Sequence, residues 1–367
     1  MSLIKNIISC LKKPPTLQRK FSVVLHIGTE KTGTTTIQEF LQINRELLAG
    51  SGFCFPKSIG NCNHRPLAVL CMASDRTNDF FRMKNFDESA ARKKWKNELL
   101  KSFDAELQQL NQNIQTVLIS SEHFSKLLNK IEGIQTLKDI LQNWFDEIKI
   151  IIYLRRQDLL STSLYNTICR TGNVTDEILP AISHRPIYYN YRKLLENWSS
   201  VFGKENICPR IFETPDFYNS KLLSDFINHS GIPEHLDYTL PENKNISHSK
   251  TAQDVVQVFN QYFPKNLNSP LYAVHRKTRH KLLEQITDKY PGQGNKPLRN
   301  EAIDFYKQFV QDNQKLAREW FGRERLFSED FSMYPESAGT TSVDLDLLDT
   351  VFSVLSKELG NSKSEQT

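Results

Sequence analysis

The chain has 367 residues, of which 39% are hydrophobic, so it can bury a sizeable core as one large domain or as two. Its net charge of +5 suits an anionic ligand, but the excess is too diffuse over this length to indicate nucleic-acid binding. No apolar run reaches the length of a membrane-spanning helix.

Residues 1–20 are expected to form a basic tail before the folded domain. Four apolar residues share one helical face there, but lysines interrupt the pattern and no clear cleavage site follows, so a secretory signal is not indicated. A helix that touches a membrane surface is the alternative that stays open. Pro14 and Pro15 mark the entry to the domain.

Six cysteines are present, and none forms a C-x-x-C pair. Cys54, Cys62 and Cys71 lie close to His64 in the sequence, but their spacing matches no common structural zinc site. We therefore expect no metal, and we expect free thiols in a reducing, cytoplasmic compartment.

The stretch that opens the domain carries the main functional signal. Residues 23–27 form a short, β-branched apolar run, which is typical of a buried strand. Gly28, Lys31 and Gly33 follow, and the apolar spacing from Ile37 onward predicts a helix. A strand, a glycine-bearing loop and a helix in this order bind phosphate, because the unpaired N–H groups and the dipole at the helix start attract an anion.

The spacing within this loop argues against a nucleoside triphosphatase. The loop of those proteins reads G-x-x-x-x-G-K-[ST], with a lysine directly after the second glycine. Here Thr34 stands in that place, and Lys31 lies two residues before Gly33, so no lysine is placed to reach the β- and γ-phosphates. A plain turn between a strand and a helix is the alternative interpretation.

The next segment contains a candidate catalytic histidine. Residues 50–60 are expected to form a loop, and His64 lies in the polar stretch that follows. A histidine in such a loop is either solvated or folded over an acceptor site. A packed surface helix is then predicted over residues 86–113.

A second strand, residues 117–120, leads into Glu122 and His123. Ligands of open α/β sheets bind at the carboxyl ends of the strands, and both side chains can take a proton there. The alternative for Glu122 is that it caps the following helix, because a carboxylate favours the helix dipole.

A third strand, residues 148–154, follows a helix over 137–145 and reads as buried on both faces. It leads into Arg155 and Arg156, and Ser163 lies two helical turns further on. Arginine at a strand end can hold a phosphate by two parallel hydrogen bonds. An ordinary ion pair is the alternative for one such arginine.

The remaining elements complete an α/β pattern. Helices are predicted over residues 188–198, 222–227, 300–318 and 347–359, and an edge strand over 206–212. Pro209 cannot donate to a strand ladder, which places that strand at an edge or ends it there. Residues 274–281 are the most basic stretch and form either a solvated face or a contact with an anionic ligand.

Two short motifs resemble the sulfotransferase family. Residues 30–35, E-K-T-G-T-T, resemble its 5′-phosphosulfate loop, usually written P-K-S-G-T-T, with Glu30 in place of proline. Arg155 and Ser163 match the family's arginine and serine, eight residues apart, that hold the 3′-phosphate. The resemblance covers roughly residues 21–331 and is to the bacterial, carbohydrate-type branch.

The strand that leads into Glu122 also resembles the strand that ends in a catalytic glutamate in heparan-sulfate enzymes. The E-K-x-P pattern of those enzymes is absent after Glu122, which leaves His123 as a rival base, with His64 as a third candidate. The family's R-K-G tripeptide is absent as well, so its contact with the 3′-phosphate has no counterpart here.

The resemblance implies a P-loop-like three-layer α/β/α fold with a mostly parallel central sheet, over residues 21–335, followed by a tail with a short helix over 336–367. It implies transfer of a sulfuryl group from 3′-phosphoadenosine 5′-phosphosulfate to a hydroxyl, with adenosine 3′,5′-bisphosphate as product. The acceptor is expected on a glycan or glycolipid, and the catalytic candidates are Lys31, Glu122, His123 and His64. The nucleotide-binding candidates are Lys31, Thr32, Gly33, Thr34, Thr35, Thr36, Arg155 and Ser163.

Two other functions stay open. A P-loop kinase would use ATP with magnesium and ignore a 3′-phosphate. A non-catalytic protein would bind a nucleotide without a working base. The sequence leaves the acceptor, the choice of base, the oligomeric state and membrane contact by the N-terminus open.

Overall fold

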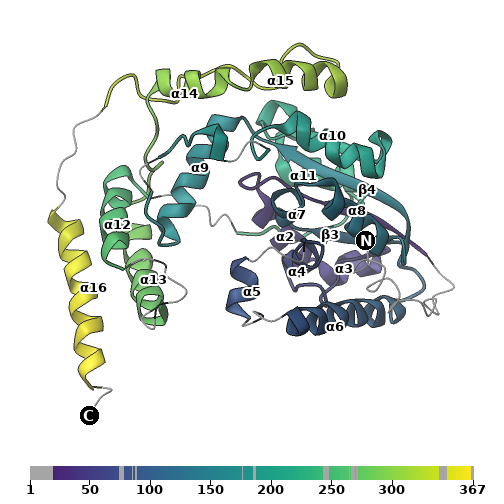
Figure 1. Ribbon diagram of the computed structural model, residues 1–367, viewed down its shortest axis with the longest axis horizontal. Helices are drawn as coiled ribbons and strands as arrows, with labels where there is room; N and C mark the ends of the chain where they lie inside the picture. The colour runs from purple at the N-terminus through teal and green to yellow at the C-terminus, as the bar shows by residue number, and fades with distance from the viewer. Residues whose placement is uncertain are drawn as a thin grey trace. The chain divides into compact units, whose positions relative to one another are not determined.

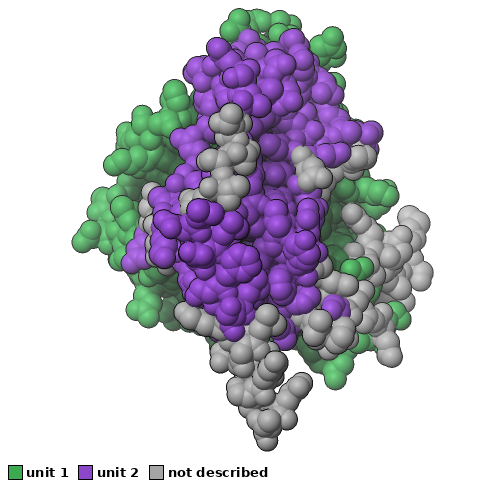
Figure 2. Space-filling view, turned by 90° about the vertical axis from the view of Figure 1, so that its left-hand side faces the viewer, with its two compact units in different colours: residues 1–156, 185–241, 310–328 green, residues 157–184, 242–309, 329–367 purple. Residues whose placement is uncertain are grey.

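The computed structural model describes residues 20–73, 78–84, 86, 89–175, 177–184, 187–242, 248–263, 265, 269, 272–338 and 345–364. The expected N-terminal tail up to residue 19, with its alternative of membrane contact, lies outside these residues. The chain forms two compact units, coloured separately in Figure 2. Unit 1 comprises residues 1–156, 185–241 and 310–328, and unit 2 comprises residues 157–184, 242–309 and 329–367.

Unit 1 is built on a five-stranded sheet with the order β2-β3-β1-β4-β5. Figure 1 labels β3 and β4 of this sheet. The strands are β1 (Phe21–His26), β2 (Phe53–Cys54), β3 (Thr116–Ser120), β4 (Phe145–Leu154) and β5 (Ile207–Ile211). Every pair of neighbouring strands is parallel. The predicted α/β fold with a mostly parallel sheet is confirmed, and the described sheet is wholly parallel.

The sequence predicts the strand at one edge of the sheet and misses the strand at the other. β5 lies at one edge, as Pro209 indicates, and Pro209 stands opposite Ile152 of β4. β2 forms the other edge within the segment that is expected to be a loop. That expectation is wrong for Phe53 and Cys54, because two residues are too few to give an alternating pattern.

The parallel register brings three strand ends to one side of the sheet. In β1, His26 stands beside Ser120 of β3 and Ile151 of β4. The segments that begin at Gly28, after Ser120 and after Leu154 therefore leave the sheet at its carboxyl edge, where α/β proteins bind ligands.

Helices cover both faces of this sheet in unit 1. The helices of unit 1 are α2 (Thr34–Ile43), α3 (Arg45–Gly50), α4 (Arg65–Leu70), α5 (Asp79–Met83), α6 (Ser89–Gln108), α7 (His123–Leu127), α8 (Ile131–Leu141), α10 (Tyr191–Phe202), α11 (Leu222–Ser230) and α15 (Val310–Leu316). A π-helical turn, Ala317–Phe321, continues α15, and short 3₁₀ turns occur at Lys204–Asn206, Thr214–Asp216 and Tyr218–Ser220.

A hydrophobic core packs against the central strands of unit 1. Val24, Leu118 and Ile151 of the three central strands pack with Phe40 of α2 and Phe226 of α11. The residues that alternate with them along the strands point to the opposite face and are equally buried, so both faces are covered. Burial of this kind contributes about 25 cal/mol for each Å² of apolar surface.

Two predicted helix limits need correction. The helix expected from residue 188 begins at Tyr191, because the Asn190 side chain accepts a hydrogen bond from the Lys193 N–H and caps it there. The helix expected over 137–145 ends at Leu141, and residue 145 already belongs to β4.

The helix predicted over 300–318 is interrupted. α14 (Arg299–Lys307) ends before α15 begins, because the N–H groups of Gln308 and Phe309 bond carbonyl groups three residues back. The apolar spacing continues through the break, so the sequence pattern does not reveal it.

Unit 2 is helical. Its helices are α9 (Gln157–Arg170), α12 (Lys250–Tyr262), α13 (Tyr272–Lys289), α14 and α16 (Leu345–Ser364), with a 3₁₀ turn at Ile182–His184. A cluster with Val256, Phe259, Leu282, Ile286 and Leu347 joins α12, α13 and α16. None of the helices among the described residues combines the length and apolarity that a membrane span requires.

The most basic predicted stretch lies on α13. Arg276, Lys277 and His280 are exposed, while Thr278 and Arg279 are buried. The Arg279 guanidinium donates to the side-chain oxygen of Asn260 at 3.2 Å. One arginine of this stretch is therefore structural, while the exposed side chains leave a contact with an anionic ligand as a prediction.

Candidate active site

The loop between β1 and α2 requires an unusual backbone. Gly28, Lys31 and Gly33 have φ angles of 51°, 65° and 71°. A Cβ atom on Gly33 would lie 2.2 Å from a methyl carbon of Leu222, so only glycine fits. Lys31 takes a left-handed conformation that a side chain disfavours, which indicates a locally strained loop.

Hydrogen bonds hold this loop at successive residues. The Thr29 hydroxyl donates to the carbonyl oxygen of Tyr153 at 2.9 Å, and the Thr32 hydroxyl donates to that of Thr29 at 2.7 Å. Arg155, directly after β4, donates from Nη1 to the carbonyl oxygen of Lys31 at 2.7 Å. The loop is thus attached to the neighbouring strand and does not depend on its own turn alone.

The N-terminus of α2 is suited to an anion. Gly33 is the N-cap, and among the described residues no side chain caps this end and no acidic residue lies in the first turn. Three threonines begin the helix: Thr34 is buried, Thr36 is half-buried and Thr35 is exposed. The first N–H groups and the positive end of the helix dipole can therefore face a phosphate.

Glu122 follows β3 in the chain and lies against this loop. A Cβ atom on Gly28 would come within 3.2 Å of the Glu122 Cα, so the glycine permits the close approach. The Glu122 carboxylate accepts from Gln38 Nε2 at 3.0 Å and from Asn63 Nδ2 at 3.1 and 3.0 Å. Its side chain is 18% exposed and keeps unused acceptor capacity.

The orientation of the Asn63 amide is fixed by its other contacts. Its oxygen accepts from the Ser121 hydroxyl at 2.7 Å and from the Arg65 N–H at 3.0 Å. The NH₂ group must therefore point to Glu122. Neither Asn63 nor Gln38 is a candidate from the sequence, although Gln38 is a buried polar residue on the first helix.

His123 lies beside Glu122. Its Nε2 is 3.6 Å from Glu122 Oε1, which is too long for a hydrogen bond but close enough for a charge interaction. Burial lowers the pKa of His123 by more than the neighbouring Glu122 raises it. The imidazole is consequently neutral near pH 7 and can accept a proton.

His64 is not a solvated loop residue, which is one of the two alternatives that the sequence leaves open. It is fully buried as the N-cap of α4 and packs on the Phe55 ring at 4.6 Å. Its Nδ1 accepts from the Ser120 N–H at 3.1 Å, and its Nε2 lies 3.1 Å from the Pro56 carbonyl oxygen. Burial lowers its pKa to about 3, so His64 acts as a neutral structural residue.

The two adjacent arginines after β4 have different surroundings. Arg156 is 2% exposed and donates to the carbonyl oxygen of Ser328 at 2.7 Å, which is a structural contact. Arg155 is half-buried, contacts the loop, and lies 5.5 Å from the centre of the Phe212 ring. Ser163 belongs to unit 2, where it is half-buried on α9 and its carbonyl accepts from Thr167.

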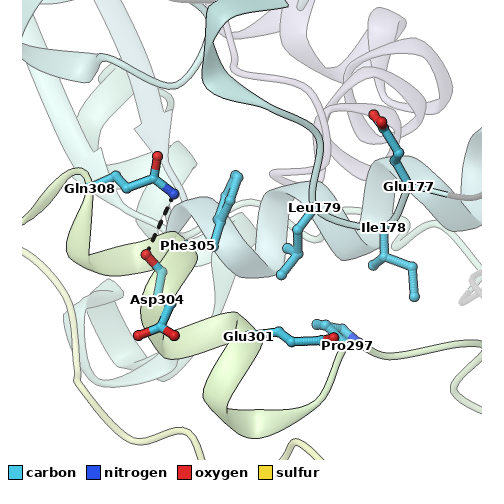
Figure 3. Close-up of a pocket in the computed structure, with 8 residues that line it drawn as sticks. All are labelled: Glu177, Ile178, Leu179, Pro297, Glu301, Asp304, Phe305 and Gln308. Atoms are coloured by element: carbon cyan, nitrogen blue, oxygen red, sulfur yellow. Dashed lines mark hydrogen bonds between the residues drawn. The ribbon is translucent and has the colours of Figure 1, made fainter.

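A pocket of about 460 Å³ lies within unit 2 (Figure 3). Glu177, Glu301 and Asp304 line it together with apolar side chains that include Leu179 and Phe305. Three carboxylates make it unsuitable for a phosphate or sulfate group. Glu301 already accepts from the Leu298 N–H in the cap of α14.

The cysteines and histidine considered for zinc are not arranged as ligands. Cys54 and Cys71 are buried, and burial raises the pKa of each thiol to about 12. Over the part of the chain that the structure describes, no group of three or more His, Cys, Asp and Glu side chains could hold a metal ion.

Comparison with known proteins places the chain in no family. No family model matches it. An uncharacterised protein of Archaeoglobus fulgidus is 30% identical over 217 residues, which are 58% of this chain, and the match spans about half (55%) of that relative's length. The crystal structure of a sulfotransferase from Alicyclobacillus acidocaldarius aligns over 82% of this chain and 96% of its own, with a TM-score of 0.39 and 14% identity. A likeness this distant carries no conclusion about activity.

Proposed function

We propose that the protein is a sulfotransferase that moves a sulfuryl group from 3′-phosphoadenosine 5′-phosphosulfate to a hydroxyl, with the carbohydrate-type acceptor that the sequence resemblance implies. The observation that carries the proposal is the hydrogen bond from Arg155 to the Lys31 carbonyl oxygen. It joins the two stretches that resemble the family's nucleotide-binding motifs, although they are far apart in the sequence.

The loop and α2 would hold the 5′-phosphosulfate. The free N-terminus of α2 supplies N–H donors, and the hydroxyls of Thr34, Thr35 and Thr36 add to them. The Thr32 hydroxyl already donates a hydrogen bond within the loop. Thr32 and Gly33 would therefore shape the backbone of the loop. Arg155 would hold the 3′-phosphate, since a guanidinium can donate two parallel hydrogen bonds to one phosphate.

Catalysis would rest on positioning and charge stabilisation. The acceptor oxygen forms a new bond to sulfur as the bond between sulfur and the 5′-phosphate oxygen breaks, and adenosine 3′,5′-bisphosphate leaves. Lys31 would stabilise the negative charge that develops on the leaving phosphate. Such a transfer needs reacting groups held in line, as phosphoryl transfer does.

Glu122 is our choice for the base that takes the acceptor proton, with His123 as the rival. Two amide donors hold the Glu122 carboxylate against the loop, which fixes its direction. His123 is the neutral alternative beside it. We do not propose His64, because both of its ring nitrogens have partners and the ring is buried.

The test is the release of adenosine 3′,5′-bisphosphate from the donor in the presence of a panel of sugars and glycolipids. We expect acceptor-dependent release and a loss of about 10²–10³-fold in Lys31→Ala, as for the loss of a transition-state donor. Equal release by Lys31→Ala, or consumption of ATP with magnesium instead, would reject the proposal.

A further inference from the structure

Glu30 places a carboxylate inside the proposed anion-binding loop. It directly precedes Lys31, and its side chain is only 17% exposed. Lys126 Nζ lies 2.9 Å from one carboxylate oxygen, and the Tyr188 hydroxyl donates to the other at 2.6 Å. Both oxygens of Glu30 are therefore engaged by donors.

The two donors come from separate parts of unit 1. Lys126 lies on α7, one turn after His123, and Tyr188 lies in the segment before α10. Together with Glu30 they line a cavity of about 40 Å³, which Thr29 and Asn129 also border. The cluster thus links the loop to the helix that carries His123 and to a third segment.

The charges in this cluster are matched. Burial alone would raise the pKa of Glu30, but Lys126 and the Tyr188 hydrogen bond outweigh that effect and hold the pKa below its ordinary value. Burial and the nearby Glu30 raise the pKa of Tyr188, so this hydroxyl stays protonated and remains a donor. Glu30 is consequently ionised, with one cation against it.

An ionised carboxylate next to Lys31 would oppose a ligand that carries several negative charges. A like charge within about 10 Å of a phosphate is screened only in part at physiological salt. Lys126 is the side chain of this cluster that supplies a compensating positive charge. Without it, the loop would present a net repulsion on the side of Glu30.

We propose that Lys126 and Tyr188 neutralise Glu30 so that the loop can accept a polyanionic donor, which makes Lys126 a specificity-determining residue for donor charge. The inference rests on the proposed function. If the ion pair between Lys126 and Glu30 were merely structural, its loss would lower the stability of the fold but leave the affinity for the nucleotide unchanged.

The experiment measures the Kd of adenosine 3′,5′-bisphosphate by titration calorimetry at low and at high salt, in the full chain. The variants are Lys126→Met, Glu30→Gln and the double variant. Lys130→Met is the control, because it removes an exposed charge of the same sign four residues further on. Thermal melting checks that each variant is folded.

We expect Lys126→Met to bind the bisphosphate about tenfold more weakly than the unmutated protein at low salt. At high salt this difference should be smaller, because the unmasked charge of Glu30 is then screened. Glu30→Gln in the same chain should restore binding to within about twofold of the unmutated protein. Lys130→Met should leave the Kd unchanged. If Lys126→Met does not fold, Tyr188→Phe replaces it in the experiment. We expect a smaller loss of affinity for the bisphosphate in that variant, which Glu30→Gln should also reverse.

Two outcomes would overturn the inference while leaving the proposed function intact. One is an unchanged Kd in Lys126→Met. The other is a loss of affinity that Glu30→Gln does not reverse, since the pair would then act only through the fold. Failure of the unmutated protein to bind the bisphosphate would instead reject the proposed function and the inference with it.

Discussion

Asn63 donates from its side-chain NH₂ to both oxygens of the Glu122 carboxylate, at 3.1 and 3.0 Å. The two residues are 59 positions apart in the sequence, and Ser121 fixes the direction of the Asn63 amide. This contact gives the proposed base one orientation against the loop after β1.

Asn63→Asp should shift the acidic limb of the pH–activity profile to higher pH. The change replaces a donor by a second carboxylate, and a neighbouring like charge disfavours the ionised form of Glu122. We expect a shift on the order of one pH unit, measured as kcat/KM against pH. Asn61→Asp is the control, because Asn61 is exposed and contacts Arg45. Identical shifts in both variants would show a general charge effect.

Glu122→Gln and His123→Gln should differ in their effect on turnover. If Glu122 takes the proton, Glu122→Gln should lower kcat by about 10²-fold or more, since glutamine cannot accept it. His123→Gln should lower kcat by less than about tenfold. The opposite order would assign the base to His123.

Arg155→Ala should weaken nucleotide binding by at least about 1.5 kcal/mol, the usual contribution of a hydrogen bond to a charged group. Arg155→Lys keeps the charge but loses the planar donors, so we expect it to recover only part of the loss. Calorimetry with adenosine 3′,5′-bisphosphate and with adenosine 5′-monophosphate would measure both effects. A variant that still prefers the bisphosphate to the same degree would argue against a 3′-phosphate site at Arg155.

Burial of His64 should make stability fall in mild acid. Its pKa is about 3 in the folded chain, against about 6.5 when unfolded, so the unfolded chain binds an extra proton below pH 6.5. Stability is therefore full above pH 6.5 and is lost as the pH falls toward 3, by about 2 kcal/mol at pH 5 for this residue.

His64→Gln removes this contribution while keeping a polar side chain. The urea midpoint of the variant should consequently change less between pH 7.5 and pH 5 than that of the unmutated protein. An equally steep change in both proteins would mean that His64 does not stay neutral in the folded state.

The sequence predicts the elements that carry local signals. The apolar runs of β1, β3 and β4 have the length and residue types of buried strands, and the glycines and threonines after β1 mark the turn into α2. Pro209 gives the edge position of β5. These features depend on neighbours in the sequence, so no tertiary information is needed to find them.

Other features depend on contacts between distant segments. Gln38 and Glu122 are 84 residues apart, and Glu30 and Tyr188 are 158 apart, so no local pattern links them. His64 lies among polar neighbours that predict an exposed loop, but Ser120 and Pro56 draw it into the interior. The break at Gln308 and Phe309 is equally invisible, because the apolar spacing continues across it.

We propose that the loop after β1 binds a nucleotide with a 3′-phosphate. The deciding measurement is titration calorimetry of the unmutated protein with adenosine 3′,5′-bisphosphate and, in parallel, with ATP plus magnesium. We predict clear binding of the bisphosphate and at least tenfold weaker binding of ATP with magnesium. Preference for ATP, or binding of neither nucleotide, would contradict the claim.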